Sequence, residues 1–131
     1  MSVGRQVTAG RDKTIPAGAD LSASTKRYTF VKVSGVYAVN TAGADELPLG
    51  IQQNLPESAK GCVVRLIGCG GSSILRIGES VTAGDALKVG ANGLAMIAAL
   101  GEAYYAIANE TAVFSATEEI EALLQTGIRQ N

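Results

Sequence analysis

Histidine and tryptophan are both missing from this 131-residue sequence, and aromatic residues make up only 5% of it. Histidine is the commonest general base and a frequent metal ligand, so its absence excludes a Ser-His-Asp arrangement and disfavours zinc. The scarcity of aromatic rings leaves no platform on which nucleotide bases would stack. We therefore expect no enzymatic activity, no cofactor or metal site and no small-molecule substrate.

The sequence also lacks an excess of either positive or negative charge. Eleven basic residues face twelve acidic ones, which leaves a net charge of -1. Binding to nucleic acid or to a membrane surface usually needs a basic surplus, so we expect neither as a partner. The N-terminal residues lack the apolar segment of a secretory signal, and the most apolar run, residues 94–108, is too short to span a bilayer. These features favour synthesis in a cytoplasm.

Cysteine occurs twice, at Cys62 and Cys69 within GCVVRLIGCGG. If this run is one strand, the odd separation points the two side chains to opposite faces. They would also lie about 23 Å apart, which is too far for a disulfide. We expect two free, buried thiols that act as small apolar residues.

Glycine, in contrast, is abundant. Sixteen glycines against three prolines, in a chain that is 47% hydrophobic, indicate short strands joined by many tight turns. The expected fold is all-β: a compact single-domain β-sandwich or barrel of short antiparallel strands. Residues 1–15 contain few apolar positions and predict an extended N-terminal arm, followed by a single β domain over residues 16–131.

The first strand pair is expected in YTFVKV and VYAV, joined by a two-residue turn at Ser34 and Gly35. The face with Val31 is the better core candidate because its neighbours are β-branched. Tyr28 and Phe30 share the other face, which we expect to be half-covered or part of an interface.

Further strands follow along the chain. CVVRLIG is apolar on both faces, which predicts a central strand, and SILRIG is expected to be its antiparallel partner across a glycine-rich loop. ALKV and LAMIA are expected to form a hairpin around Asn92 and Gly93. Residues 115–118 fit a helix capping box, but residues 117–125 also alternate as a strand would, and the many short strands around them favour a strand.

Two sequence motifs invite other interpretations. The triplet T-A-G occurs at residues 8–10, 41–43 and 82–84, but its flanks do not align, so we interpret it as shared turn chemistry and not as a repeat. GESVTAGDALKVGANGLAMI has the spacing of a biotinyl or lipoyl carrier hairpin. Its lysine, Lys88, precedes the turn instead of occupying the tip, so we expect an ordinary strand residue and no carried group.

The order of the remaining elements resembles the phage capsid cement, or head decoration, proteins. The resemblance covers roughly residues 16–125 and lies in turn-and-strand spacings. The elements that carry it are the AGAD turn at residues 17–20, VYAV, LPLGIQ, Gly61 with Val63, VTAGDALKV, the following GLA and the GEA at residues 101–103.

This resemblance implies a non-enzymatic virion protein, made in the bacterial host cytoplasm, that binds the outer surface of an icosahedral capsid. The implied partners are the major capsid protein and further copies of the chain, as a homotrimer. The expected contact residues lie in the arm and on the first aromatic strand: Val3, Arg5, Val7, Arg11, Lys13, Tyr28 and Phe30. The alternative is a small intracellular β-barrel that acts as a binding module without catalysis.

Overall fold

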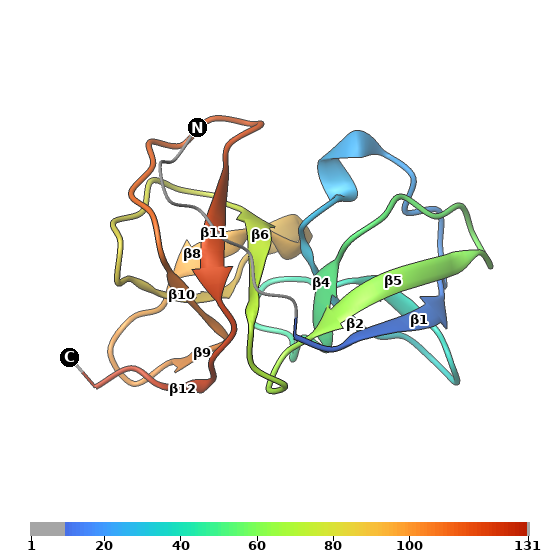
Figure 1. Ribbon diagram of the computed structural model, residues 1–131, viewed down its shortest axis with the longest axis horizontal. Coiled ribbons are helices and arrows are strands. Elements are labelled where there is room, and N and C mark those ends of the chain that lie inside the picture. Colours follow the sequence, from blue (N-terminus) through green and yellow to red (C-terminus); the bar gives the residue numbers. More distant parts are fainter. Residues whose placement is uncertain (1–9, 131) are drawn as a thin grey trace.

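The computed structural model describes residues 10–130 and confirms an all-β fold with antiparallel sheets. Within that range the regular elements are twelve strands and two three-residue 3-10 turns. Figure 1 shows two five-stranded sheets side by side, with β6 at the boundary between them. Both sheets are open, so neither is a closed barrel.

The first sheet has the strand order β1-β5-β4-β2-β3. Its strands are β1 (Asp12–Pro16), β2 (Phe30–Val33), β3 (Val39–Thr41), β4 (Gly50–Gln52) and β5 (Gly61–Leu66). The second sheet has the order β6-β11-β10-β7-β8. Its strands are β6 (Ser72–Arg76), β7 (Ala86–Val89), β8 (Ala95–Ile97), β10 (Ala106–Ala108) and β11 (Glu119–Leu123). A short ribbon joins β9 (Ala103–Tyr104) to β12 (Gly127–Ile128).

The two sheets have the same topology. Strands β1 to β5 correspond in order to β6, β7, β8, β10 and β11, and the two strand orders then agree at every position. The chain is therefore built from two copies of one unit. We call residues 11–66 the first repeat and residues 71–124 the second repeat.

The hydrogen bonds follow the same correspondence. Ala17 forms an isolated parallel bridge with Val39, and Ile77 forms one with Ala95. The next residue donates to the same acceptor in each case, from Gly18 to the Val39 carbonyl at 2.7 Å and from Gly78 to the Ala95 carbonyl at 2.8 Å. Strand order alone does not require these bridges and hydrogen bonds to match, so they are further evidence of the duplication.

The cores of the two repeats also match. Six buried side chains of the first repeat have a buried counterpart at the same position of the second. The pairs are Ala17 and Ile77, Leu21 and Val81, Val31 and Leu87, Val39 and Ala95, Cys62 and Ile120, and Val64 and Ala122. Each repeat thus fills one face of its own sheet in the same way.

We expected no repeat from the T-A-G triplets, and this holds for the triplets, although the chain does contain a duplication. The triplets themselves are not equivalent: residues 41–43 correspond to residues 97–99, and residues 82–84 correspond to residues 26–28. Little sequence identity survives at corresponding positions. The duplication therefore lies in topology and register, where comparison of short motifs does not find it.

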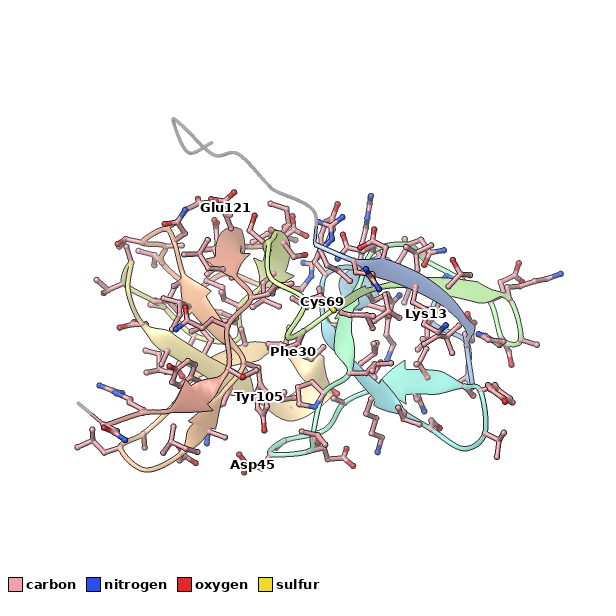
Figure 2. All side chains as sticks on the ribbon, turned by 60° about the horizontal axis from the view of Figure 1, so that its bottom comes forward. Lys13, Phe30, Asp45, Cys69, Tyr105 and Glu121 are labelled. Atoms are coloured by element: carbon pink, nitrogen blue, oxygen red, sulfur yellow. The ribbon has the colours of Figure 1, made fainter. Side chains whose placement is uncertain are left out.

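Phe30 joins the two repeats into one domain. Its side chain is 0% exposed and packs, with Ile51, into the core cluster of the second repeat, whereas Val31 points into the core of the first. Figure 2 shows Phe30 between the two repeats. The expectation that the Phe30 face is half-covered was wrong, because the second repeat covers this face of the first sheet.

The sheet begins earlier than the sequence indicated. β1 starts at Asp12 and pairs with β5 along its whole length, so residues 12–15 belong to the sheet and not to an arm. Asp12 accepts a hydrogen bond from the Arg65 guanidinium at 2.9 Å, and Ile15 packs against the first core. Residues 1–9 lie outside the described residues.

Two predicted connections also differ. The turn between β2 and β3 has five residues, closed by a 2.8 Å bond from the Ser34 N–H to the Ala38 carbonyl, instead of a two-residue turn. β6 pairs with β11 and not with β5, so the glycine-rich loop after β5 crosses from one sheet to the other. β5 does lie inside its sheet, between β1 and β4, as predicted.

The cysteines are both free, but only Cys62 is buried. Cys69 is exposed, because β5 ends at Leu66 and Cys69 lies in the crossing loop and not on a strand. In residues 117–125 the strand interpretation is confirmed by β11. The β7–β8 hairpin is confirmed as well.

Replacing Phe30 with alanine should lower the free energy of unfolding by about 3–5 kcal/mol, because it leaves a cavity where the repeats meet. Urea denaturation measures this loss. The control is Phe114→Ala, whose ring is half exposed and should cost less than about 1 kcal/mol. Equal losses in the two variants would show that Phe30 does not hold the repeats together.

Candidate functional site

The residues expected to contact a partner divide into three groups. Val3, Arg5 and Val7 lie outside the described residues. Arg11 and Lys13 are exposed at the beginning of the first sheet, on and beside its edge strand β1. Figure 2 shows Lys13 on the surface of the first repeat.

Tyr28 and Phe30 do not form an exposed aromatic face. Phe30 is buried, so it cannot contact a partner, and the sequence prediction was wrong for this residue. Tyr28 is half-buried, with the Arg27 guanidinium 4.8 Å from the centre of its ring. Its backbone has a φ of 65° and lies before β2 begins, so the alternation that grouped Tyr28 with Phe30 does not hold.

Backbone and side-chain contacts hold the two repeats at a fixed position. The Arg76 N–H, on β6, donates to the Tyr28 carbonyl at 2.8 Å. The Arg76 guanidinium is almost fully buried and donates to the Ser24 carbonyl at 3.4 Å and to Glu119 at 3.0 Å. Because a buried guanidinium needs all its donors satisfied, these bonds restrict how the repeats can move.

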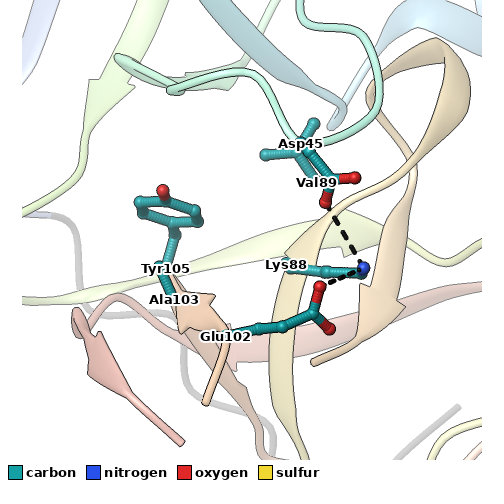
Figure 3. A pocket seen from close by; sticks show the side chains of 6 residues that line it. All are labelled: Asp45, Lys88, Val89, Glu102, Ala103 and Tyr105. Atoms are coloured by element: carbon teal, nitrogen blue, oxygen red, sulfur yellow. Dashed lines mark hydrogen bonds and ion pairs between the residues drawn. The ribbon is translucent and has the colours of Figure 1, made fainter. Parts of the chain in front are cut away.

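Lys88 makes a second connection between the repeats. Its ammonium group lies 2.9 Å from a Glu102 carboxylate oxygen within the second repeat and 3.3 Å from an Asp45 oxygen of the first. Figure 3 shows these interactions in a pocket that Val89 and Tyr105 also line. The Asp45 N–H donates to the Val89 carbonyl at 3.1 Å. A backbone hydrogen bond and an ion pair therefore connect the two repeats at the same place.

The charged groups in this pocket shift one another's pKa. The hydrogen bond to Glu102 raises the pKa of Lys88 above its usual range, and the same bond lowers the pKa of Glu102. Lys88 is therefore a fully charged ammonium group at neutral pH and is poorly suited to act as a nucleophile or base. The ion pairs of Lys88 therefore connect the two repeats.

The fold also controls the protonation of a buried cysteine. Burial raises the pKa of the Cys62 thiol to about 11, so the thiolate is not formed at neutral pH. Among the described residues, no cluster of three or more metal-ligating side chains is present. No helix in residues 10–130 has the length and apolar character to cross a membrane.

The sequence prediction missed the role of Lys88, which was expected to be an ordinary strand residue. One signal was available: Lys32 and Glu46 form the same ion pair in the first repeat, at 2.6 Å, with the same spacing of fourteen residues. Glu46 also accepts a hydrogen bond from the Gly43 N–H, and Glu102 accepts the equivalent hydrogen bond from the Ala99 N–H. A search for spaced Lys and Glu pairs would have found the duplication.

Comparison with known proteins identifies a shared fold. No family model matches the chain, and no curated protein matches it. Among solved structures the chain is similar to the head fiber gp8.5 N base of bacteriophage phi29, with a TM-score of 0.67 and 14% sequence identity. The match covers 88% of this chain and 93% of that one, so it spans both repeats.

Removing the Lys88 ammonium group should lower the stability of the fold and make that stability less dependent on pH. The pKa of Glu102 is lowered from an ordinary value of 4.5, so its stabilisation is present above that pH and is lost as the pH falls through the folded-state pKa. We expect Lys88→Met to lower the melting temperature at pH 7 and to reduce the further decrease between pH 7 and pH 3.

The matched control is Lys32→Met, which removes the equivalent ion pair without breaking a contact between repeats. Thermal melts followed by circular dichroism should show the larger loss at pH 7 for Lys88→Met. An equal loss for both variants would mean that the Asp45 contact contributes nothing.

Proposed function

We propose that this protein is a phage structural protein that binds the outer surface of an icosahedral head as a decoration protein. The observation that carries the proposal is the two-repeat fold, shared over nearly the whole chain with a protein whose structure is described as the head fiber base of a phage. The resemblance of the sequence to capsid decoration proteins supports the same assignment independently.

The proposed role is structural and not catalytic. A decoration protein stabilises a shell by binding its assembled state at many equivalent positions, which needs surfaces and no reactive groups. Lys88 is held by two carboxylates, and Cys62 is buried and protonated. The proposed partners are the major capsid protein and further copies of this chain, as a homotrimer on the virion.

The proposed contact with the capsid uses the N-terminal segment and the beginning of β1. Arg11 and Lys13 are exposed there, at the β1 edge of the first sheet. An edge strand with exposed cations suits an acidic partner, to which residues 1–9 would add further contacts. Since β1 is part of the sheet, only residues before it can be removed without disturbing the fold.

Charge reversal at Arg11 and Lys13 together should weaken binding to capsids about tenfold, as expected for two exposed charge contacts. The measurement is co-sedimentation of purified protein with capsids of the phage that encodes it, over a range of concentrations. The control, Lys60→Glu, reverses an exposed lysine between β4 and β5. Unchanged affinity in the double variant would exclude this end of the sheet from the contact.

Deleting residues 2–9 should leave the melting temperature unchanged and abolish capsid binding in the same assay. β1 is retained in this truncation, so a loss of binding would not reflect a damaged sheet. Full occupancy of the capsid by the truncated protein would contradict a role for the segment. Failure of the wild-type protein to co-sediment at any concentration would overturn the proposed function.

A further inference from the structure

β1 forms one edge of the first sheet and pairs with β5 on one side only, as Figure 1 shows. At one end of this ladder, the Leu66 N–H donates to the Arg11 carbonyl at 2.9 Å. At the other end, the Ala17 N–H donates to the Lys60 carbonyl at 2.8 Å. Backbone groups alternate in direction along an antiparallel strand, so the odd-numbered residues from 11 to 17 direct theirs to β5. The even-numbered residues between them direct theirs away from the sheet.

Three residues of β1 therefore present backbone groups at the outer edge: Asp12, Thr14 and Pro16. Asp12 and Thr14 each present an N–H and a carbonyl, whereas Pro16 presents a carbonyl alone because proline has no N–H. Within residues 10–130, no hydrogen bond uses any of these groups. The edge thus offers a row of unpaired donors and acceptors, which an extended segment can bind.

The equivalent edge of the second repeat is covered. β6 corresponds to β1, with Ser72 and Arg76 at the positions of its first and last residues. The Ser72 carbonyl accepts a hydrogen bond from the Arg65 guanidinium at 3.2 Å, and the Arg76 N–H donates to the Tyr28 carbonyl at 2.8 Å. Both partners belong to the first repeat. The first repeat thus covers the β6 edge, whereas no residue in the described part of the chain covers the β1 edge.

The charge beside the β1 edge is positive. Asp12, the acidic residue of the strand, is already bonded to the Arg65 guanidinium through both carboxylate oxygens, at 2.9 and 3.3 Å. Arg11 and Lys13 are exposed and form no ion pair with any residue from 10 to 130. A segment with acidic side chains therefore complements this edge, and a second copy of β1, which carries the same two cations, does not.

We propose that an extended acidic segment of the major capsid protein pairs with the outer edge of β1 and becomes a sixth strand of the first sheet. Backbone hydrogen bonds to Asp12, Thr14 and Pro16 hold the segment, and its carboxylates pair with Arg11 and Lys13. The inference rests on the proposed function, since it names the way in which the capsid binds at this end of the sheet.

Thr14→Pro tests the backbone contact. It removes the central outward N–H and places a ring where the added strand would lie, but it leaves the pairing with β5 intact. The matched control is Thr14→Val, which has a similar shape and keeps the N–H. In co-sedimentation with capsids, the proline variant should bind at least about tenfold more weakly, and the valine variant should bind as the wild type does. Circular dichroism melts verify that both variants are folded.

Hydrogen exchange tests the same contact in the wild-type protein, without a substitution. The amides of Asp12 and Thr14 should exchange at least about tenfold more slowly in the capsid-bound protein than in the free protein. The control is the amide of Val113, an exposed loop residue whose N–H also forms no hydrogen bond within residues 10–130. Its exchange should not change.

A synthetic peptide tests the chemistry of the partner without capsids. The probe is a heptapeptide in which glutamate and valine alternate, and its control has lysine in place of glutamate. The acidic peptide should slow the exchange of the Thr14 amide, and the basic peptide should not, because Arg11 and Lys13 repel it. Equal effects of the two peptides, or no effect of the acidic one, would overturn the inference.

The capsid measurements separate this inference from the proposed function. Capsid binding that is equally strong in the wild type and in Thr14→Pro would overturn the inference and leave the proposed function intact. Unchanged exchange at Asp12 and Thr14 on bound capsids would do the same. Failure of the wild type to bind capsids would overturn the proposed function and the capsid as the source of the segment. Slower exchange with the acidic peptide would then still support strand addition at this edge.

Discussion

The fold depends on one packing contact, in which the second repeat covers one face of the first sheet. Each five-stranded sheet buries one face with residues of its own repeat, such as Val31 in the first and Leu87 in the second. The opposite face of the first sheet bears Phe30 and Ile51, which would be costly to expose to water. Packing of the second repeat on these two residues removes that cost and gives the chain one continuous core cluster across the boundary.

The polar contacts at the boundary follow from this packing. Once the β6 edge lies on the outer face of the first sheet, the Gln53 side chain reaches the Ser73 hydroxyl at 3.0 Å, and the Arg65 guanidinium reaches the Ser72 carbonyl at 3.2 Å. Lys88 then lies near Asp45. Because exposed ion pairs contribute little individually, these bonds determine the position of the repeats more than they determine stability. The apolar contact supplies most of the free energy.

Local sequence patterns predicted the strands well. CVVRLIG, ALKV and LAMIA became β5, β7 and β8, and β11 was correctly assigned as a strand although EEIEALL also suits a helix. In these segments, alternation and turn residues act within a few positions, so the sequence contains the necessary information. The segment around Asn92 shows the same: its φ of 59° fits the turn that Asn-Gly predicted.

Pairing between distant segments could not be predicted in the same way. SILRIG follows β5 closely and looks like its partner, but its buried residue Leu75 packs opposite Ile120 of β11. The choice depends on which side chains fill a shared core, and that information is spread over the whole second repeat. The same reason explains Phe30: its burial results from a repeat that begins about forty residues later.

The duplicated fold also explains why the candidate site was hard to find. Short motifs describe local chemistry, whereas the duplication lies in strand order and register, so motifs contain no information about it. What distinguishes the two repeats is which apolar residues are covered. Val33 and Val89 are the same residue type at the same position of the same fold, and only the neighbouring repeat makes one buried and the other exposed. In this fold the burial of a valine at this position is therefore set by the repeat in which it lies.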